Sequence, residues 1–176
     1  MITHEYIKIG VTGHRSVEDE FLIRKLIRKV LRTLENESQG TAYIFIAISP
    51  IAEGSDRLVA EEILSFNDKN KLTVVLPLER EDYMNDFKTS ESKGEFLNLL
   101  NQADEVINLP KTPKRKDAYL QVGKYVADNC DVLIAIWDGL PSRGKGGTAE
   151  IVDYARINKK PIYWINSVTG EINYLD

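Results

Sequence analysis

Residues 130–151, CDVLIAIWDGLPSRGKGGTAEI, contain an uninterrupted apolar run, a glycine-rich loop and the first turn of a predicted helix. An apolar run without polar alternation is typical of a strand that is covered on both faces. Four glycines lie between Asp138 and Gly147, and the helix is expected from Thr148 to Asn158. A strand, a loop and a helix in this order indicate one unit of a parallel α/β sheet.

The same alternation recurs along the chain and predicts a doubly wound sheet. Apolar runs predict six strands, at Tyr6–Gly10, Tyr43–Ser49, Leu72–Leu76, Glu105–Leu109, Val132–Trp137 and Pro161–Ile165. Helical spacing predicts further helices at Glu18–Glu37, Ser55–Phe66, Glu95–Gln102 and Ala118–Asn129. Because no hairpin signal separates two strands, we expect a mainly parallel, Rossmann-like sheet with helices on both faces. We expect residues 1–176 to form one domain.

Length and composition exclude several classes of protein. The chain has 176 residues, of which 43% are hydrophobic and 28% charged, as in a globular protein. Its net charge of −4 argues against broad binding to nucleic acid or to an anionic membrane. One cysteine and two histidines exclude a disulfide framework and disfavour a metal site, and nothing in the sequence implies a cofactor. No apolar run approaches the ~20 residues of a membrane span, so we expect a cytoplasmic protein, either monomeric or a homo-oligomer.

The loop after the first predicted strand offers groups for a ligand. Its sequence is GVTGHR, residues 10–15, and the glycines allow the backbone to approach a ligand closely. Gly13 belongs to this loop, and the side chains of Thr12, His14 and Arg15 supply hydrogen-bond donors. Arg15 suits a phosphate, because a guanidinium can bind it with two parallel hydrogen bonds.

The loop after the second predicted strand, AEGSDR at residues 52–57, precedes a helix. Gly54 stands before this helix, whose first amides can bind an anion. Ser55 and Asp56 either contact the ligand or only cap the helix. Glu53 is a further candidate for the site, or forms a surface ion pair with Arg57.

The third loop, which precedes Thr148, carries the most specific pattern. Adjacent Gly146 and Gly147 allow backbone amides to face a phosphate, and the helix dipole favours the negative charge. Glu150 falls in the first helical turn, where its carboxylate is placed for a ribose hydroxyl or a catalytic task. The alternative is an ordinary first-turn residue, which the dipole also favours. Asp138 is the best candidate for a second acid–base group.

The three loops follow the first, second and fifth predicted strands. They can contact one shared ligand only if the first strand lies between the second and the fifth. Right-handed crossovers then predict the strand order 4-3-2-1-5-6, with the reversal between strands one and five.

The three motifs GVTGHR, AEGSDRLVAE and CDVLIAIWDG…GKGGTAEIVDYA together resemble the SLOG superfamily of Rossmann-like proteins. This group includes the Lonely Guy phosphoribohydrolases, DNA-processing proteins and N-terminal domains of melastatin-type TRP channels, and the likeness is greatest to its small bacterial stand-alone members. The resemblance implies a domain that binds a nucleotide or a nucleotide-derived ligand. It places Gly13, Arg15, Gly54 and Asp56 around that ligand, together with the residues of the third loop: Gly146, Gly147, Thr148 and Glu150.

The chain departs from the Lonely Guy pattern in the third loop. Lys145 stands where those enzymes have proline, the glycine spacing is shortened, and the chain has no Met-His-Glu-Arg stretch. The segment GTAEI is also similar to that of nucleoside 2-deoxyribosyltransferases, whose nucleophilic glutamate corresponds to Glu150.

Three functions are therefore expected in order of preference. The first is a nucleotide-binding sensor or carrier without chemistry of its own. The second is an N-glycosidic-bond enzyme, a phosphoribohydrolase or deoxyribosyltransferase that uses Glu150 as nucleophile or base. The third is a binder of single-stranded nucleic acid, which the acidic charge disfavours.

Overall fold

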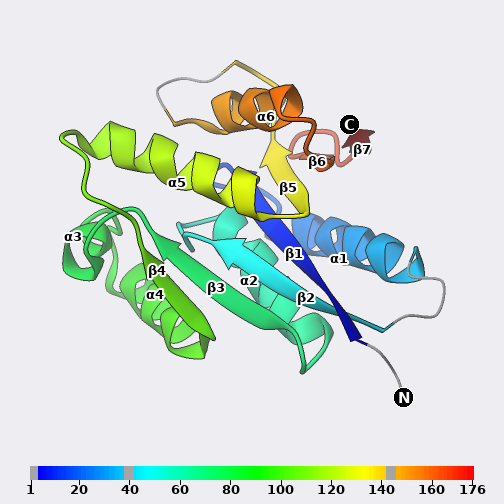
Figure 1. The fold of residues 1–176 in the computed structure, drawn as a ribbon, viewed down its shortest axis with the longest axis horizontal. Helices are drawn as coiled ribbons and strands as arrows, with labels where there is room; N and C mark the ends of the chain where they lie inside the picture. Colours follow the sequence, from blue (N-terminus) through cyan, green and yellow to red (C-terminus); the bar gives the residue numbers. More distant parts are fainter. Residues whose placement is uncertain (1–3, 38–41, 142–145) are drawn as a thin grey trace.

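The computed structural model of the protein describes residues 4–37, 42–141 and 146–176. Seven strands form one sheet in the order β4-β3-β2-β1-β5-β6-β7 (Figure 1). Neighbouring strands are parallel except for β6 and β7, which are antiparallel. The strands are β1 (His4–Gly13), β2 (Ala42–Ser49), β3 (Lys71–Leu76), β4 (Glu105–Asn108), β5 (Val132–Trp137), β6 (Ile162–Asn166) and β7 (Ile172–Leu175). The helices are α1 (Glu20–Asn36), α2 (Ser55–Phe66), α3 (Arg80–Met84), α4 (Ser90–Gln102), α5 (Arg115–Asn129) and α6 (Thr148–Ile157).

Helices cover both faces of the sheet and bury a separate apolar layer on each. The layer under α1, α2 and α4 contains Ile9, Ile27 and Phe96, which are fully buried. The layer under α5 and α6 contains Leu133 and Ala135, also fully buried. Figure 1 shows α5 crossing one face of the sheet, with α6 beside it. The α/β class, the Rossmann-like architecture and the order of the first six strands, all predicted from sequence, are confirmed.

The seventh strand was not predicted, because no hairpin signal was recognised after β6. The chain turns at residues 166–170, where Asn166 Oδ1 accepts hydrogen bonds from the amides of Val168 and Thr169. Gly170 completes the turn with a φ of 72°, a left-handed conformation that favours glycine. The Asn and Gly of this turn are the signals in the sequence that could have revealed the hairpin.

The first strand is longer than predicted, and this changes the role of Gly10. β1 continues through residues 10–13, which pair with β5. Gly10 therefore does not begin a turn. A Cβ atom at this position would lie 2.8 Å from Cys130 Sγ and 2.9 Å from Val126 Cγ1, so Gly10 allows α5 to pack closely on the sheet. The prediction that the loop begins at residue 10 is wrong, because a glycine that serves packing was interpreted as the end of the strand.

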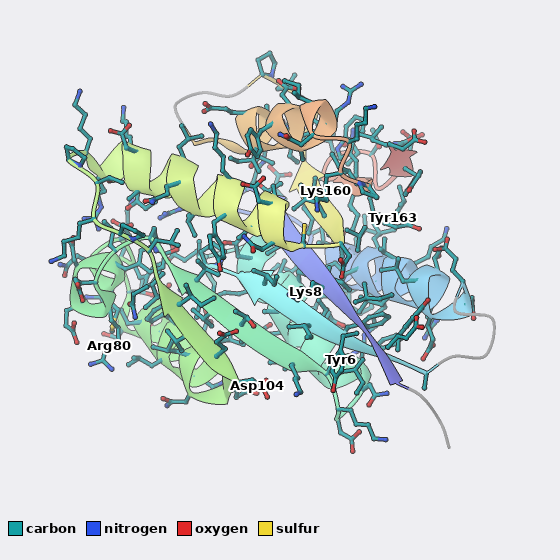
Figure 2. The ribbon with its side chains drawn as sticks, viewed as in Figure 1. Tyr6, Lys8, Arg80, Asp104, Lys160 and Tyr163 are labelled. Carbon is teal, nitrogen blue, oxygen red and sulfur yellow. The ribbon has the colours of Figure 1, made fainter. Side chains whose placement is uncertain are left out.

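Polar contacts hold together the strand starts, at the edge opposite the ends of β1 and β5. Asp104 Oδ2 accepts a hydrogen bond of 3.0 Å from the Leu72 amide, and Asp131 Oδ2 accepts one of 2.8 Å from the Lys8 amide. Lys160 donates to the carbonyl of Cys130. Figure 2 labels Lys8, Asp104 and Lys160. In the described parts of the chain, no helix combines the length and apolar character needed to cross a membrane.

Candidate functional site

A cavity of about 630 Å³ lies at the carboxyl ends of β1 and β5, the two strands between which the chain reverses direction across the sheet. This is the position at which doubly wound sheets bind ligands, and its volume is in the range of small-molecule sites. The structure brings together at the cavity the following residues singled out from sequence: Thr12, Gly13, His14, Arg15, Asp56, Asp138, Gly146, Gly147 and Thr148. Glu53, Gly54, Ser55 and Glu150 do not line it.

The first loop is fixed to the start of α2. Ser55 donates two hydrogen bonds to the His14 carbonyl, one of 3.0 Å from its amide and one of 2.9 Å from its hydroxyl. Gly13 permits this approach, because a Cβ atom there would lie 2.4 Å from Ser55 Cβ and 2.7 Å from the Ile136 carbonyl oxygen. Ser55 is fully buried, so its part is to hold the loop in place.

The second loop reaches α2 through an unusual backbone conformation. Ile51, a buried β-branched residue, has a φ of 49°, which is uncommon and strained for such a side chain. Gly54 has a φ of 75°, and a Cβ atom there would lie 2.4 Å from the Arg15 carbonyl oxygen. Neither residue lines the cavity, and both shape the backbone that leads into α2. They position the Ala52 amide, which donates a hydrogen bond of 3.3 Å to Asp56 Oδ2.

Asp56 is a buried carboxylate on the cavity wall, with 7% of its surface exposed. Burial raises the pKa of Asp56 to about 7, although the hydrogen bond from Ala52 and the positive charges of Arg15 and Arg57 act in the opposite direction. Its side chain does not cap α2, because no side-chain capping bond is present at the helix start.

Arg15 lies at the cavity with 45% of its side chain exposed. Its Nη2 is 3.7 Å from Asp86 Oδ2, and its guanidinium carbon lies 5.5 Å from the ring centre of Tyr119. Asp86 also accepts hydrogen bonds from Arg115 and from the Tyr119 hydroxyl. Arg15 is therefore held loosely over an aromatic ring, within reach of an anion in the cavity.

Where the ends of β1 and β5 meet, the side chains of His14 and Asp138 lie close together on the cavity wall. His14 Nε2 is 3.7 Å from Asp138 Oδ1, and the same oxygen accepts a 3.0 Å hydrogen bond from the Leu140 amide. The neighbouring Trp137 is stacked on Trp164, with 4.7 Å between ring centres, and its Nε1 donates to the Leu140 carbonyl. The indole of Trp137 is thus engaged in packing.

Glu150 contacts its own loop. Its Oε2 accepts a hydrogen bond of 2.6 Å from the Gly146 amide, and the side chain is absent from the cavity wall. Gly147 and Thr148 do line the cavity, at the start of α6. The first amides of a helix have no partner within it, so they are available to an anion.

Some cavity residues were not found by sequence analysis. Tyr83 follows β3, and Tyr119 comes from α5, neither of which belongs to the three loops. They become neighbours of the site only through the fold. Arg57, for which a surface ion pair with Glu53 was one expected alternative, is buried and donates to the Ile51 carbonyl, and its Nη1 donates to Ser92 and Glu95. This expectation was wrong because α2 packs against α4, which covers Arg57.

The cavity combines three kinds of surface. It offers a helix N-terminus and an arginine for an anion, buried oxygens for a neutral polar group, and an apolar wall from α5 and α6. No cluster of three or more His, Cys, Asp or Glu side chains within the described ranges is placed to hold a metal ion. Neither a protein-family model nor a curated protein matches the sequence.

Proposed function

We propose that the protein binds a nucleotide or a nucleotide-derived small molecule in this cavity, as a sensor or carrier domain. The observation that carries the proposal is the position of the start of α6. Gly147 and Thr148 border a cavity of about 630 Å³ at the reversal of strand order. The first amides of a helix at the border of a cavity of this size favour a phosphorylated ligand over an apolar one.

Arg15 supports the same ligand class from the β1 side. Its partly exposed guanidinium is 3.7 Å from Asp86, a distance longer than a normal hydrogen bond. A phosphate can therefore gain contacts from Arg15 without displacing a short hydrogen bond between the two side chains. The guanidinium also lies over the Tyr119 ring, a cation–π contact that favours the positive charge at this place.

Binding is preferred over glycosidic-bond chemistry because of the contacts of Glu150. A nucleophilic carboxylate has to reach the reacting carbon, and a general base has to reach the attacking water. The Glu150 carboxylate is instead bonded to the Gly146 amide and lies outside the cavity wall. Single-stranded nucleic acid is a weaker candidate, because the chain carries a net charge of −4.

The test measures thermal stabilisation of the protein by AMP, GMP, ADP-ribose and ribose 5-phosphate, for the wild type and for Gly147→Leu. Gly147 has a φ of −74° and a ψ of 164°, which a leucine adopts without strain. We expect at least one of these ligands to stabilise the wild type. The added side chain should abolish that stabilisation by filling the phosphate position, and the fold should remain intact.

Gly94→Leu is the matched control. Gly94 lies in α4, and a Cβ atom there would meet no other atom within 4 Å. This variant should keep the ligand response of the wild type. Equal stabilisation of the wild type and Gly147→Leu would contradict the proposed position of the phosphate.

A further inference from the structure

Two buried polar side chains at the inner wall of the cavity have oxygens without a hydrogen-bond partner. Asp56 is 7% exposed and Tyr83 is 1% exposed, and both line the cavity. Asp56 accepts only the bond from Ala52, through Oδ2, and the Tyr83 hydroxyl makes no hydrogen bond with the described residues. The fully enclosed, unpartnered side-chain atoms among those residues are Arg57 Nη2 and Gln121 Oε1. The free oxygens of Asp56 and Tyr83 are therefore open to the cavity.

Buried polar groups are almost always paired, so an open pair of this kind calls for a ligand group or ordered water. Above about pH 7, the pKa to which burial raises Asp56, its side chain is a carboxylate and only accepts hydrogen bonds. Burial raises the pKa of Tyr83 above its usual range, so its hydroxyl keeps its proton and can donate one hydrogen bond. A complementary ligand group must therefore donate to Asp56 and accept from Tyr83.

Charge narrows the choice of ligand group. The guanidiniums of Arg15 and Arg57 act on Asp56 and disfavour an ammonium group beside it. A phosphate would face the Asp56 carboxylate and is better placed at the start of α6. A neutral vicinal diol meets both limits, because it carries two O–H donors and its oxygens also accept.

The topology separates these two positions. Asp56 follows β2, and the start of α6 follows β5, and these strands lie on opposite sides of β1. Two strand spacings correspond to about 10 Å. A sugar phosphate can bridge such a span with its phosphate at one side and its hydroxyls at the other.

We propose that Asp56 and Tyr83 form a ribose subsite, in which Asp56 accepts hydrogen bonds from the 2′ and 3′ hydroxyls and Tyr83 donates one to a hydroxyl oxygen. This inference rests on the proposed function and adds an orientation to it. The ligand lies across the end of β1, with its phosphate at Gly147 and Thr148 and its diol at Asp56. The protein consequently prefers ribonucleotides to 2′-deoxyribonucleotides.

The experiment is calorimetric titration of the full chain at pH 8, where Asp56 is ionised, with AMP, GMP and their 2′-deoxy and 3′-deoxy forms. The wild type should bind the ribonucleotides about tenfold or more tightly than either deoxy form, since each loses a hydrogen bond to a charged group. Asp56→Asn, which can still accept from Ala52, should weaken ribonucleotide binding about tenfold and reduce the ribo-to-deoxy ratio below about threefold.

Tyr83→Phe is the second variant, and it removes only a hydroxyl that has no partner in the described structure. It should fold as the wild type does and bind ribonucleotides about threefold to tenfold more weakly, with a smaller effect on the deoxy form that lacks its acceptor. Asp68→Asn is the matched control, because Asp68 is exposed beyond the far end of α2 and should bind like the wild type.

The outcomes separate this inference from the proposed function. Equal affinity of the wild type for ribo and deoxy forms would overturn the subsite and leave nucleotide binding intact. A preference between AMP and GMP that depends on Asp56, without a hydroxyl effect, would place the base there and also overturn it. If no nucleotide of the panel binds, the proposed function is overturned and the subsite with it.

Discussion

The two walls of the cavity are built by different means. The wall from β1 and α2 is polar and enclosed. In it the Ser55 hydroxyl donates a hydrogen bond to the His14 carbonyl, and Asp56 is only 7% exposed. The wall from α5 and α6 is apolar, and Gly123 lets the two helices approach until a Cβ atom would lie 2.5 Å from Ile151 Cδ1. Away from the phosphate position at the start of α6, the first wall is suited to choosing a ligand by hydrogen bonds and the second by shape.

Asp56 in the polar wall should make the free energy of unfolding fall as pH rises. Removing this titration by substitution is the largest effect that we expect. Asp56 keeps its proton up to about pH 7 in the folded chain, against an ordinary pKa of 3.8. Between these values the folded state binds more protons than the unfolded state, so the free energy of unfolding falls as pH rises. A three-unit shift corresponds to at most about 4 kcal/mol. The contribution of the protonated Asp56 side chain to the free energy of unfolding is fully present below pH 4 and is lost above pH 7.

Asp56→Asn removes this titration while Arg15, Arg57 and Tyr83 stay in place. Relative to the wild type, the variant should gain stability as pH rises from 4 to 8, by up to about 4 kcal/mol. Urea unfolding at pH 4, 5.5 and 8 measures the difference, and Asp68→Asn provides an exposed control. Parallel pH profiles for wild type and Asp56→Asn would show that Asp56 ionises normally.

The walls should also differ in their response to one added methyl group. In Gly13→Ala the Cβ meets Ser55 Cβ at 2.4 Å and the Ile136 carbonyl oxygen at 2.7 Å, neither of which can move easily. We expect a loss of about 3 kcal/mol, at the upper end for overpacking. In Gly123→Ala the nearest atoms to the Cβ are Cδ1 and Cγ1 of the Ile151 side chain, at 2.5 and 2.7 Å, and these can shift more easily than a backbone carbonyl. The clash is then partly offset by about 1 kcal/mol of helix propensity.

Gly94→Ala isolates the propensity gain, since no atom lies within 4 Å of its added Cβ. Thermal and urea unfolding of the three variants should rank Gly94→Ala above Gly123→Ala and Gly123→Ala above Gly13→Ala. Similar losses at positions 13 and 123 would mean that the polar wall adapts as easily as the apolar one.

The sequence predicted the sheet well because strand order depends on patterns that are local and repeated. Apolar runs located β2, β3 and β5, and the glycine-rich loops indicated which strand ends had to meet. The hairpin to β7 was missed because a five-residue turn with a four-residue strand leaves little periodicity.

Residues of the cavity could be predicted only where they belong to a recognisable sequence motif. Thr12 and Arg15 belong to the glycine-containing motif GVTGHR at the end of β1, Asp56 and Thr148 lie at helix starts, and all four line the cavity. Tyr83 has no such signal, because it is brought to the cavity by packing with Phe87 and Phe96 in the apolar layer beneath.

The orientation of the Glu150 side chain could not be predicted from the sequence either. Spacing alone does not tell whether the Glu150 carboxylate turns outward to the cavity or back to its own loop, since both lie within reach of a first-turn side chain. The structure shows the second arrangement, in which the carboxylate accepts from Gly146.

Glu150→Gln should have the smallest effect, and it tests the choice between binding and catalysis. The amide oxygen of glutamine can still accept from Gly146, so only the charge-assisted part of that bond is lost, about 1 kcal/mol of stability. Because the side chain lies outside the cavity wall, nucleotide affinity should fall less than about tenfold. Release of free base or ribose phosphate from nucleoside monophosphates, deoxynucleosides and ADP-ribose should be undetectable for both proteins. Turnover by the wild type that falls by several orders of magnitude in Glu150→Gln would require the carboxylate to leave Gly146 and enter the cavity, and would replace the binding function with a glycosidic-bond reaction.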